Sequence, residues 1–137
     1  MTAVPADTII GSIPDIMAGV RVAEAARAAG VPLRLVDHGD WVAALIGPPR
    51  PVGAVVDLSA DEAIGRIAEA VAAGVTVLAF GPHVDHRAMA AAEAAGAVRV
   101  VARGQMMQQA GRLLASLASG AAAAGRPSPE ERDADGA

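Results

Sequence analysis

The residues of this chain that could do chemistry are single polar side chains that follow apolar runs. Asp57 closes the run GAVVD at residues 53–57, and Asp15 lies just after an earlier run at 8–13. Two carboxylates that meet with water can hold Mg²⁺, a hard cation that prefers oxygen ligands in octahedral geometry. The alternative is structural: Asp15 caps a helix, and Asp57 accepts hydrogen bonds from the loop that follows it. The sequence leaves both interpretations open.

The histidines suggest a second kind of site. His83, Asp85 and His86 lie close together in the sequence, and imidazole groups on one helical face can hold a metal ion. A zinc site needs three or four convergent ligands, and only Asp40 or Asp57 could supply a distant one. Ordinary roles in a loop and at a helix start explain these residues better. We therefore expect no metal here.

The segment DHGD at residues 37–40 allows a similar choice. Asp40 is the type of residue that caps a helix, and a short apolar helix at 40–46 follows it. We expect Trp41 to anchor that helix to the core, with stacking on a ligand as the alternative. No GxGxxG run opens the first helix, and neither a Ser-His-Asp nor a Cys-His arrangement is indicated. The sequence therefore does not predict an enzyme.

Composition argues against several function classes. The chain has 137 residues, of which 53% are hydrophobic, with one Phe, one Trp and no Cys. A formal net charge of −4 without a basic cluster argues against nucleic-acid binding, which depends on neutralising phosphates. No apolar run approaches the roughly 18 residues that a membrane-spanning helix needs, and no signal peptide is indicated. Because cysteine is absent, we expect a reducing compartment and a cytoplasmic protein.

A recurring phrase marks the ends of helices. The letters AAG followed by Val or Ala occur at residues 28–31, 72–75 and 94–97. Glycine accepts the left-handed backbone that closes a helix, so each phrase ends a helix and leads into a strand. The pattern predicts strands at residues 8–13, 33–37, 53–58, 75–80 and 98–102. It predicts helices at residues 15–29, 40–46, 59–73, 84–95 and 105–119.

The predicted strands are continuous apolar runs, which is typical of strands covered by helices on both faces. Strands that alternate with such helices form parallel βαβ units with right-handed crossovers. The fold class is therefore α/β: a flavodoxin-like three-layer sandwich with a five-stranded parallel sheet, order 2-1-3-4-5, and five helices. Asp57 then lies at the carboxyl edge of the sheet. The letters SADE at 59–62 match a capping box for the third helix.

Residues 1–119 are expected to form this single domain. From residue 120 the composition changes to small residues, two prolines and an acidic end. Such a segment has little apolar surface to stabilise an ordered structure. We expect residues 120–137 to be a flexible tail, with an extra turn of docked helix through Ala124 as the alternative.

The helix at 105–119 has a wide apolar face. Helical spacing directs Met106, Leu113 and Leu117 toward the sheet and puts Met107 and Leu114 on a flanking stripe. Core packing explains the stripe. The alternative is a surface for a partner or for self-association, because methionine adapts to varied surfaces.

Several segments together resemble response-regulator receiver domains. They are the order of elements, VVDL at 55–58, VTVLAFG at 75–81 and AAEAAGAVRVV at 91–101, and the likeness covers residues 7–119. In that family an acidic pair after the first strand binds Mg²⁺, and an aspartate ending the third strand takes a phosphoryl group from a histidine kinase. A Ser or Thr ends the fourth strand and a Lys the fifth, and both contact the phosphate.

On this resemblance Asp57 takes the phosphoacceptor position, but its neighbours differ from the family pattern. Asp15 is the one carboxylate left of the acidic pair, and it comes late. Gly81 stands where the family has a hydroxyl, and Arg103 lies beside the lysine position in a chain without lysine. Phosphoryl transfer depends on a metal and cations that neutralise the transferring group. The resemblance therefore implies a degenerate receiver, or pseudo-receiver.

Three functions follow as expectations. The first is a non-catalytic signalling and protein-interaction domain that docks on a protein partner, with homodimerisation through Met107 and Leu114 as one form. The second is a phosphorylatable single-domain response regulator that uses Asp57 with Mg²⁺, assisted by Asp15 and Arg103. The third is a small-molecule-binding domain or minor enzyme at the carboxyl edge, with Asp57, His83 and Trp41 around the ligand.

Overall fold

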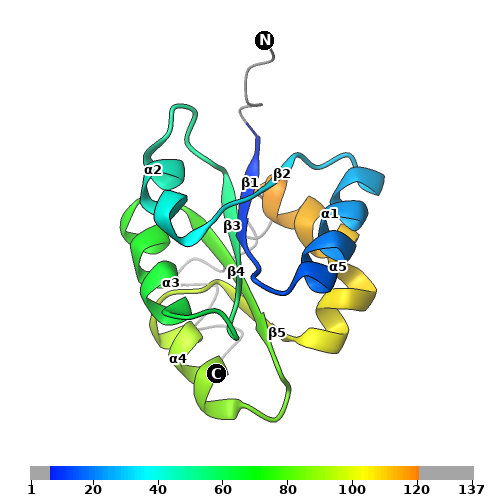
Figure 1. The fold of residues 1–137 in the computed structure, drawn as a ribbon, viewed down its shortest axis with the longest axis vertical. Coiled ribbons are helices and arrows are strands. Elements are labelled where there is room, and N and C mark those ends of the chain that lie inside the picture. Colours follow the sequence, from blue (N-terminus) through cyan, green and yellow to red (C-terminus); the bar gives the residue numbers. More distant parts are fainter. Residues whose placement is uncertain (1–6, 121–137) are drawn as a thin grey trace, which may run out of the picture.

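A computed structural model describes residues 7–120, which form one parallel sheet between two layers of helices (Figure 1). The order of strands in the sheet is β2-β1-β3-β4-β5, and every neighbouring pair is parallel. The predicted fold class and strand order are therefore confirmed. The strands are β1 Ile9–Ser12, β2 Leu33–Leu35, β3 Gly53–Asp57, β4 Thr76–Gly81 and β5 Arg99–Ala102.

The helices divide between the two faces of the sheet. In Figure 1, α1 and α5 cover one face, and α2, α3 and α4 cover the other. A short 3₁₀ turn, His38–Asp40, leads directly into α2. Within residues 7–120, none of the helices has both the length and the apolar content to cross a membrane. The helices are α1 Ile16–Ala28, α2 Trp41–Ile46, α3 Ala63–Ala72, α4 His86–Ala94 and α5 Arg103–Ala118.

Each face of the sheet has its own apolar core. On the side of α2, α3 and α4, the core includes Trp41, Ile67 and Val77, all at most 1% exposed. On the side of α1 and α5, Val22 and Phe80 are completely buried. This two-sided burial explains why the strands read as continuous apolar runs. The predicted tail at 120–137 lies outside the described residues apart from Gly120.

Of the three predicted helix-capping interactions, one is confirmed and two are absent. Asp15 caps α1 as expected, because its Oδ1 accepts the Ala18 N–H at 3.1 Å. Asp40 precedes α2 but makes no capping bond, since its backbone (φ −102°, ψ 0°) is not extended as a cap requires. The capping box at 59–62 is absent: α3 begins later, at Ala63, and the Ser59 hydroxyl bonds to Asp57 instead.

The packing of α5 corrects the predicted interface. Leu114 is completely buried in the core beneath α1 and α5, so it is not available to a partner, and Met107 is half-buried. The cause is the close approach of the two helices at Gly111. A Cβ atom there would lie 3.5 Å from the Ala25 carbonyl oxygen. The flanking stripe therefore faces α1, and the apolar width of α5 is explained by core packing.

Candidate functional site

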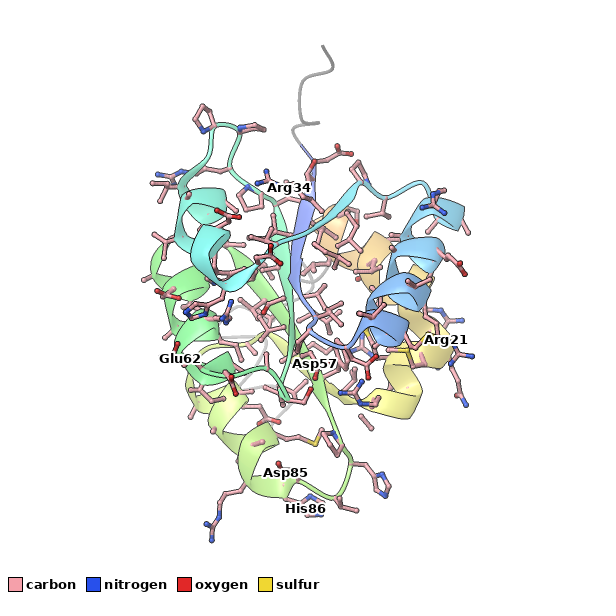
Figure 2. All side chains as sticks on the ribbon, in the orientation of Figure 1. Arg21, Arg34, Asp57, Glu62, Asp85 and His86 are labelled. Carbon is pink, nitrogen blue, oxygen red and sulfur yellow. The ribbon has the colours of Figure 1, made fainter. Side chains whose placement is uncertain are left out.

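Asp57 is the last residue of β3 and lies completely buried at the carboxyl edge of the sheet (Figure 2). The turn after β3 folds back on its side chain. Oδ1 accepts the Ser59 backbone N–H at 2.9 Å and the Ser59 hydroxyl at 2.8 Å. The turn is held further by the Ala60 N–H, which donates to the Asp57 carbonyl at 3.0 Å. Asp57 is thus a structural part of this turn as well as a charged group.

Arg103 opens α5 and supplies the charge that balances Asp57. Its Nη2 lies 2.9 Å from Asp57 Oδ1 and 3.4 Å from the Ser59 hydroxyl. The guanidinium carbon lies 5.3 Å from the centroid of the Phe80 ring, a cation–π distance. A planar guanidinium can stack on a ring while it donates hydrogen bonds sideways, which an ammonium group cannot do. Asp57 and Arg103, both expected at the carboxyl edge of the sheet, thus form an ion pair.

The two carboxylate oxygens of Asp57 have unequal surroundings. Oδ1 receives all three donors described above. Oδ2 is buried and has no hydrogen-bond partner among the described residues. A buried polar atom without a partner costs roughly 1–3 kcal/mol, and more when it carries charge. The ion pair with Arg103 offsets part of that cost.

The residues around Asp57 do not fit a magnesium site. Mg²⁺ needs oxygen ligands in near-octahedral geometry, usually from one or two carboxylates and water. Here Asp15 is exposed and its Oδ1 caps α1, while the oxygen of Asp57 that has polar neighbours already faces a guanidinium. Within residues 7–120, no three His, Asp or Glu side chains are grouped for a metal ion.

Gly81 ends β4, and its surroundings explain why no hydroxyl stands there. A Cβ atom at this position would lie 3.0 Å from Leu58 Cβ and 3.1 Å from Leu58 Cδ1. A serine or threonine would therefore need Leu58 to move. Leu58 itself is fixed by its backbone N–H, which donates to the Phe80 carbonyl at 2.8 Å. The position that the resemblance assigns to a phosphate-binding hydroxyl is filled by a leucine side chain.

The histidines near α4 have ordinary roles. His83 and His86 are exposed, and Asp85 caps α4 by accepting the Ala88 N–H at 3.0 Å. Figure 2 shows Asp85 and His86 at one end of the molecule, where α4 begins. In the described part of the chain, these side chains are not grouped with a third possible metal ligand.

A third arrangement was not predicted from the sequence. Arg66 of α3 is only 5% exposed, and its Nη2 contacts His38 Nδ1 in the 3₁₀ turn. Trp41 Nε1 donates to the Arg66 carbonyl at 3.2 Å, so the anchoring role of Trp41 includes this residue. An arginine on a helix ordinarily indicates a solvated face, and 28 positions separate it from His38. Only the fold brings them together.

Comparison with known proteins identifies the fold. No protein-family model and no curated protein sequence matches the chain. Among solved structures, a putative response regulator from Chloroflexus aurantiacus is similar at TM-score 0.69 and 16% identity, covering 82% of this chain and 97% of that one.

Two other solved structures are similar to the same extent. A response regulator receiver protein from Pseudoalteromonas atlantica has TM-score 0.69 at 12% identity, covering 83% of this chain and 98% of that chain. The signal receiver domain of a putative response regulator, NarL, from Mycobacterium tuberculosis has TM-score 0.66 at 17% identity, with coverages of 82% and 95%. The chain therefore has the fold of response-regulator receiver domains.

Proposed function

We propose that this chain is a receiver-like signalling domain that acts by docking on a partner protein and does not accept a phosphoryl group at Asp57. The observation that carries the proposal is the complete burial of the Asp57 side chain. A carboxylate that attacks phosphorus must present an oxygen lone pair to the donor molecule. Oδ2 is buried, and Oδ1 is occupied by Ser59 and Arg103.

The groups that would stabilise phosphoryl transfer are also incomplete. Catalysis of this reaction rests on positioning and on cations or donors that neutralise the transferring oxygens. Asp15 caps a helix, and Leu58 fills the space beside Gly81. Arg103 is the one cation beside Asp57 among the described residues, and its charge is already paired. These features support a domain that signals through its surface and not through covalent chemistry.

The rival proposal is a phosphorylatable response regulator, and one feature favours it. Arg103 Nη2 and the Ser59 hydroxyl both lie next to Asp57, and both could donate to phosphate oxygens after a rearrangement of the turn. That rearrangement must expose an oxygen of Asp57 and break its present bonds. The two proposals therefore differ in a measurable way.

The test is treatment of the full chain with acetyl phosphate, and separately with beryllofluoride, in the presence of Mg²⁺. We expect intact mass to show no added phosphoryl group and amide NMR spectra to remain unchanged. The matched control is Asp57→Asn, which should behave identically to the wild type. Labelling of the wild type that the Asn variant lacks, or large amide shifts with beryllofluoride, would refute the proposal in favour of its rival.

A further inference from the structure

A cavity of about 360 Å³ opens at the carboxyl edge of the sheet, beside the Asp57 site. It is lined by the segments that follow β1 and β2 and by the turn that leads into α3. In open α/β sheets, ligands bind outside the carboxyl ends of the strands, where the strand order reverses. In this sheet the strand order reverses between β1 and β3. From β1 the chain continues to β2 on one side, and from β3 it continues to β4 and β5 on the other side. The volume lies within the range of small-molecule sites.

Arg66 lines this cavity, and no ion pair holds its guanidinium in the described part of the chain. The residue is 5% exposed, yet within residues 7–120 no carboxylate lies within ion-pairing distance of its guanidinium. Its Nε donates to the Asp61 carbonyl at 3.4 Å, and its Nη2 contacts His38 Nδ1.

The position of Arg66 is fixed from several sides. Trp41 Nε1 holds its carbonyl at 3.2 Å, and His38 Nε2 in turn lies 3.5 Å from Glu62 Oε2. Two of the five guanidinium N–H groups are used. No nitrogen of Arg66 is among the buried side-chain atoms without a partner in residues 7–120, so the remaining donors reach solvent, and the cavity lies beside them. An anionic group in the cavity would accept these donors and pair with the charge of the guanidinium.

The rim of the same cavity has the opposite charge. Asp37, Asp61 and Glu62 are all exposed residues of its lining, and Figure 2 shows Glu62 on the side of the sheet that α3 covers. A simple anion would be repelled by this rim. A ligand with an ammonium group as well as a carboxylate satisfies both the arginine and the rim. Apolar side chains, including that of Leu35, which is 43% exposed, line the remainder of the cavity.

We propose that this cavity binds an aliphatic 2-amino acid, or a small molecule with the same zwitterionic head. The carboxylate pairs with the guanidinium of Arg66 in the fork geometry that arginine favours. The ammonium group lies among the carboxylates of Asp37, Asp61 and Glu62, and the aliphatic part contacts the apolar lining. Binding here involves no covalent step. It neither needs nor excludes phosphorylation of Asp57.

The test is titration of the full chain with leucine, monitored by amide NMR and by calorimetry, together with valine and alanine. Two probes of the same shape separate the charges: 4-methylpentanoate lacks the ammonium group, and 3-methylbutylamine lacks the carboxylate. We expect leucine to shift amides of the cavity lining and both probes to bind about tenfold to a hundredfold more weakly. No shifts with any amino acid at millimolar concentration would refute the site. Equal binding of 4-methylpentanoate would refute the role of the acidic rim.

Two variants assign the residues. Arg66→Met should abolish binding, whereas Arg112→Met, at an exposed position of α5, should leave binding unchanged. Because Arg66 is buried, its variant is first checked for folding by circular dichroism. If it does not fold, the double variant Asp37→Asn/Glu62→Gln decides, since both side chains are exposed. This double variant should bind leucine about tenfold or more weakly than the wild type does, and it should bind 4-methylpentanoate no more weakly. Unchanged leucine affinity in that variant would overturn the proposal.

Discussion

The ion pair between Asp57 and Arg103 should respond asymmetrically to the removal of its two partners. Arg103→Met keeps an aliphatic chain over Phe80 but leaves a buried carboxylate without its cation. Removing one partner of a buried pair costs about 3–5 kcal/mol. The Arg103 side chain is 31% exposed, so solvent screens part of its charge, and we expect a smaller loss, about 2–3 kcal/mol.

Asp57→Asn should be much less damaging. The arginine left behind can turn toward water, and the buried oxygen without a partner becomes part of a neutral amide. Losing one charged hydrogen bond while removing a buried charge gives a net change within about 1 kcal/mol in either direction. The double variant Asp57→Asn/Arg103→Met should then recover most of the stability that Arg103→Met loses. The coupling between the two positions is expected to be about 2 kcal/mol.

The assay is urea unfolding followed by circular dichroism, with thermal melts as a second measurement. For a domain of this size, a loss of 2–3 kcal/mol corresponds to a fall in Tm of roughly 10 °C. Arg112→Met is the matched control, since Arg112 is exposed on the same helix and should change stability by less than about 0.5 kcal/mol. If Asp57→Asn proves as destabilising as Arg103→Met, the carboxylate contributes net stability and the reasoning about its desolvation is wrong.

Three further predictions test the packing that positions this edge, each by urea unfolding. Gly53→Ala should lower the free energy of unfolding by about 1–3 kcal/mol, because its Cβ would lie 2.6 Å from a core leucine atom. Gly65→Ala, in open space on α3, should raise the free energy of unfolding by about 0.5–1 kcal/mol, and the opposite order of stabilities would contradict the close contact at Gly53. Leu114→Ala should cost about 2–5 kcal/mol without changing the oligomeric state in size-exclusion chromatography, and Met107→Ala should cost less; a change of oligomer with unchanged stability would restore the surface interpretation of Leu114. Asp15→Ala should cost about 0.5–2 kcal/mol through the lost cap, and the loss should be independent of Mg²⁺; a dependence on Mg²⁺ would return Asp15 to a metal site.

The strands and their order were predictable because the signals are local and repeated. Each strand is a run of apolar residues, and glycines such as Gly30 and Gly74 have the positive φ that the end of a helix requires. The helix starts were harder. The hydroxyl of Ser59 had two possible partners, a helix N–H or the Asp57 carboxylate, and the sequence favours both. The buried carboxylate decided the outcome, because it needs donors more than an exposed helix end does.

The site was predictable only in part. Asp57 ends β3 and Arg103 follows β5, so the parallel topology alone brings the two residues to the same edge of the sheet. The proximity of Arg66 and His38 depends on how the 3₁₀ turn before α2 lies against α3, which no periodicity encodes. Likewise, the burial of Leu114 depends on the approach of α1 to α5 at Gly111. Such helix–helix contacts depend on tertiary packing, and the apolar stripe of one helix does not determine how that helix packs against another.

The two arginines at the carboxyl edge divide it into parts with different chemistry. Arg103 is paired with a buried carboxylate, so it offers a ligand little net charge, and any anion that bound there would have to separate the pair. Arg66 has no such partner within the described residues, and a cavity lies beside it. An incoming ligand gains more free energy where it satisfies unused donors than where it must replace existing ones. On this argument the proposed ligand binds on the side of β1 and β2, and not at the aspartate that ends β3.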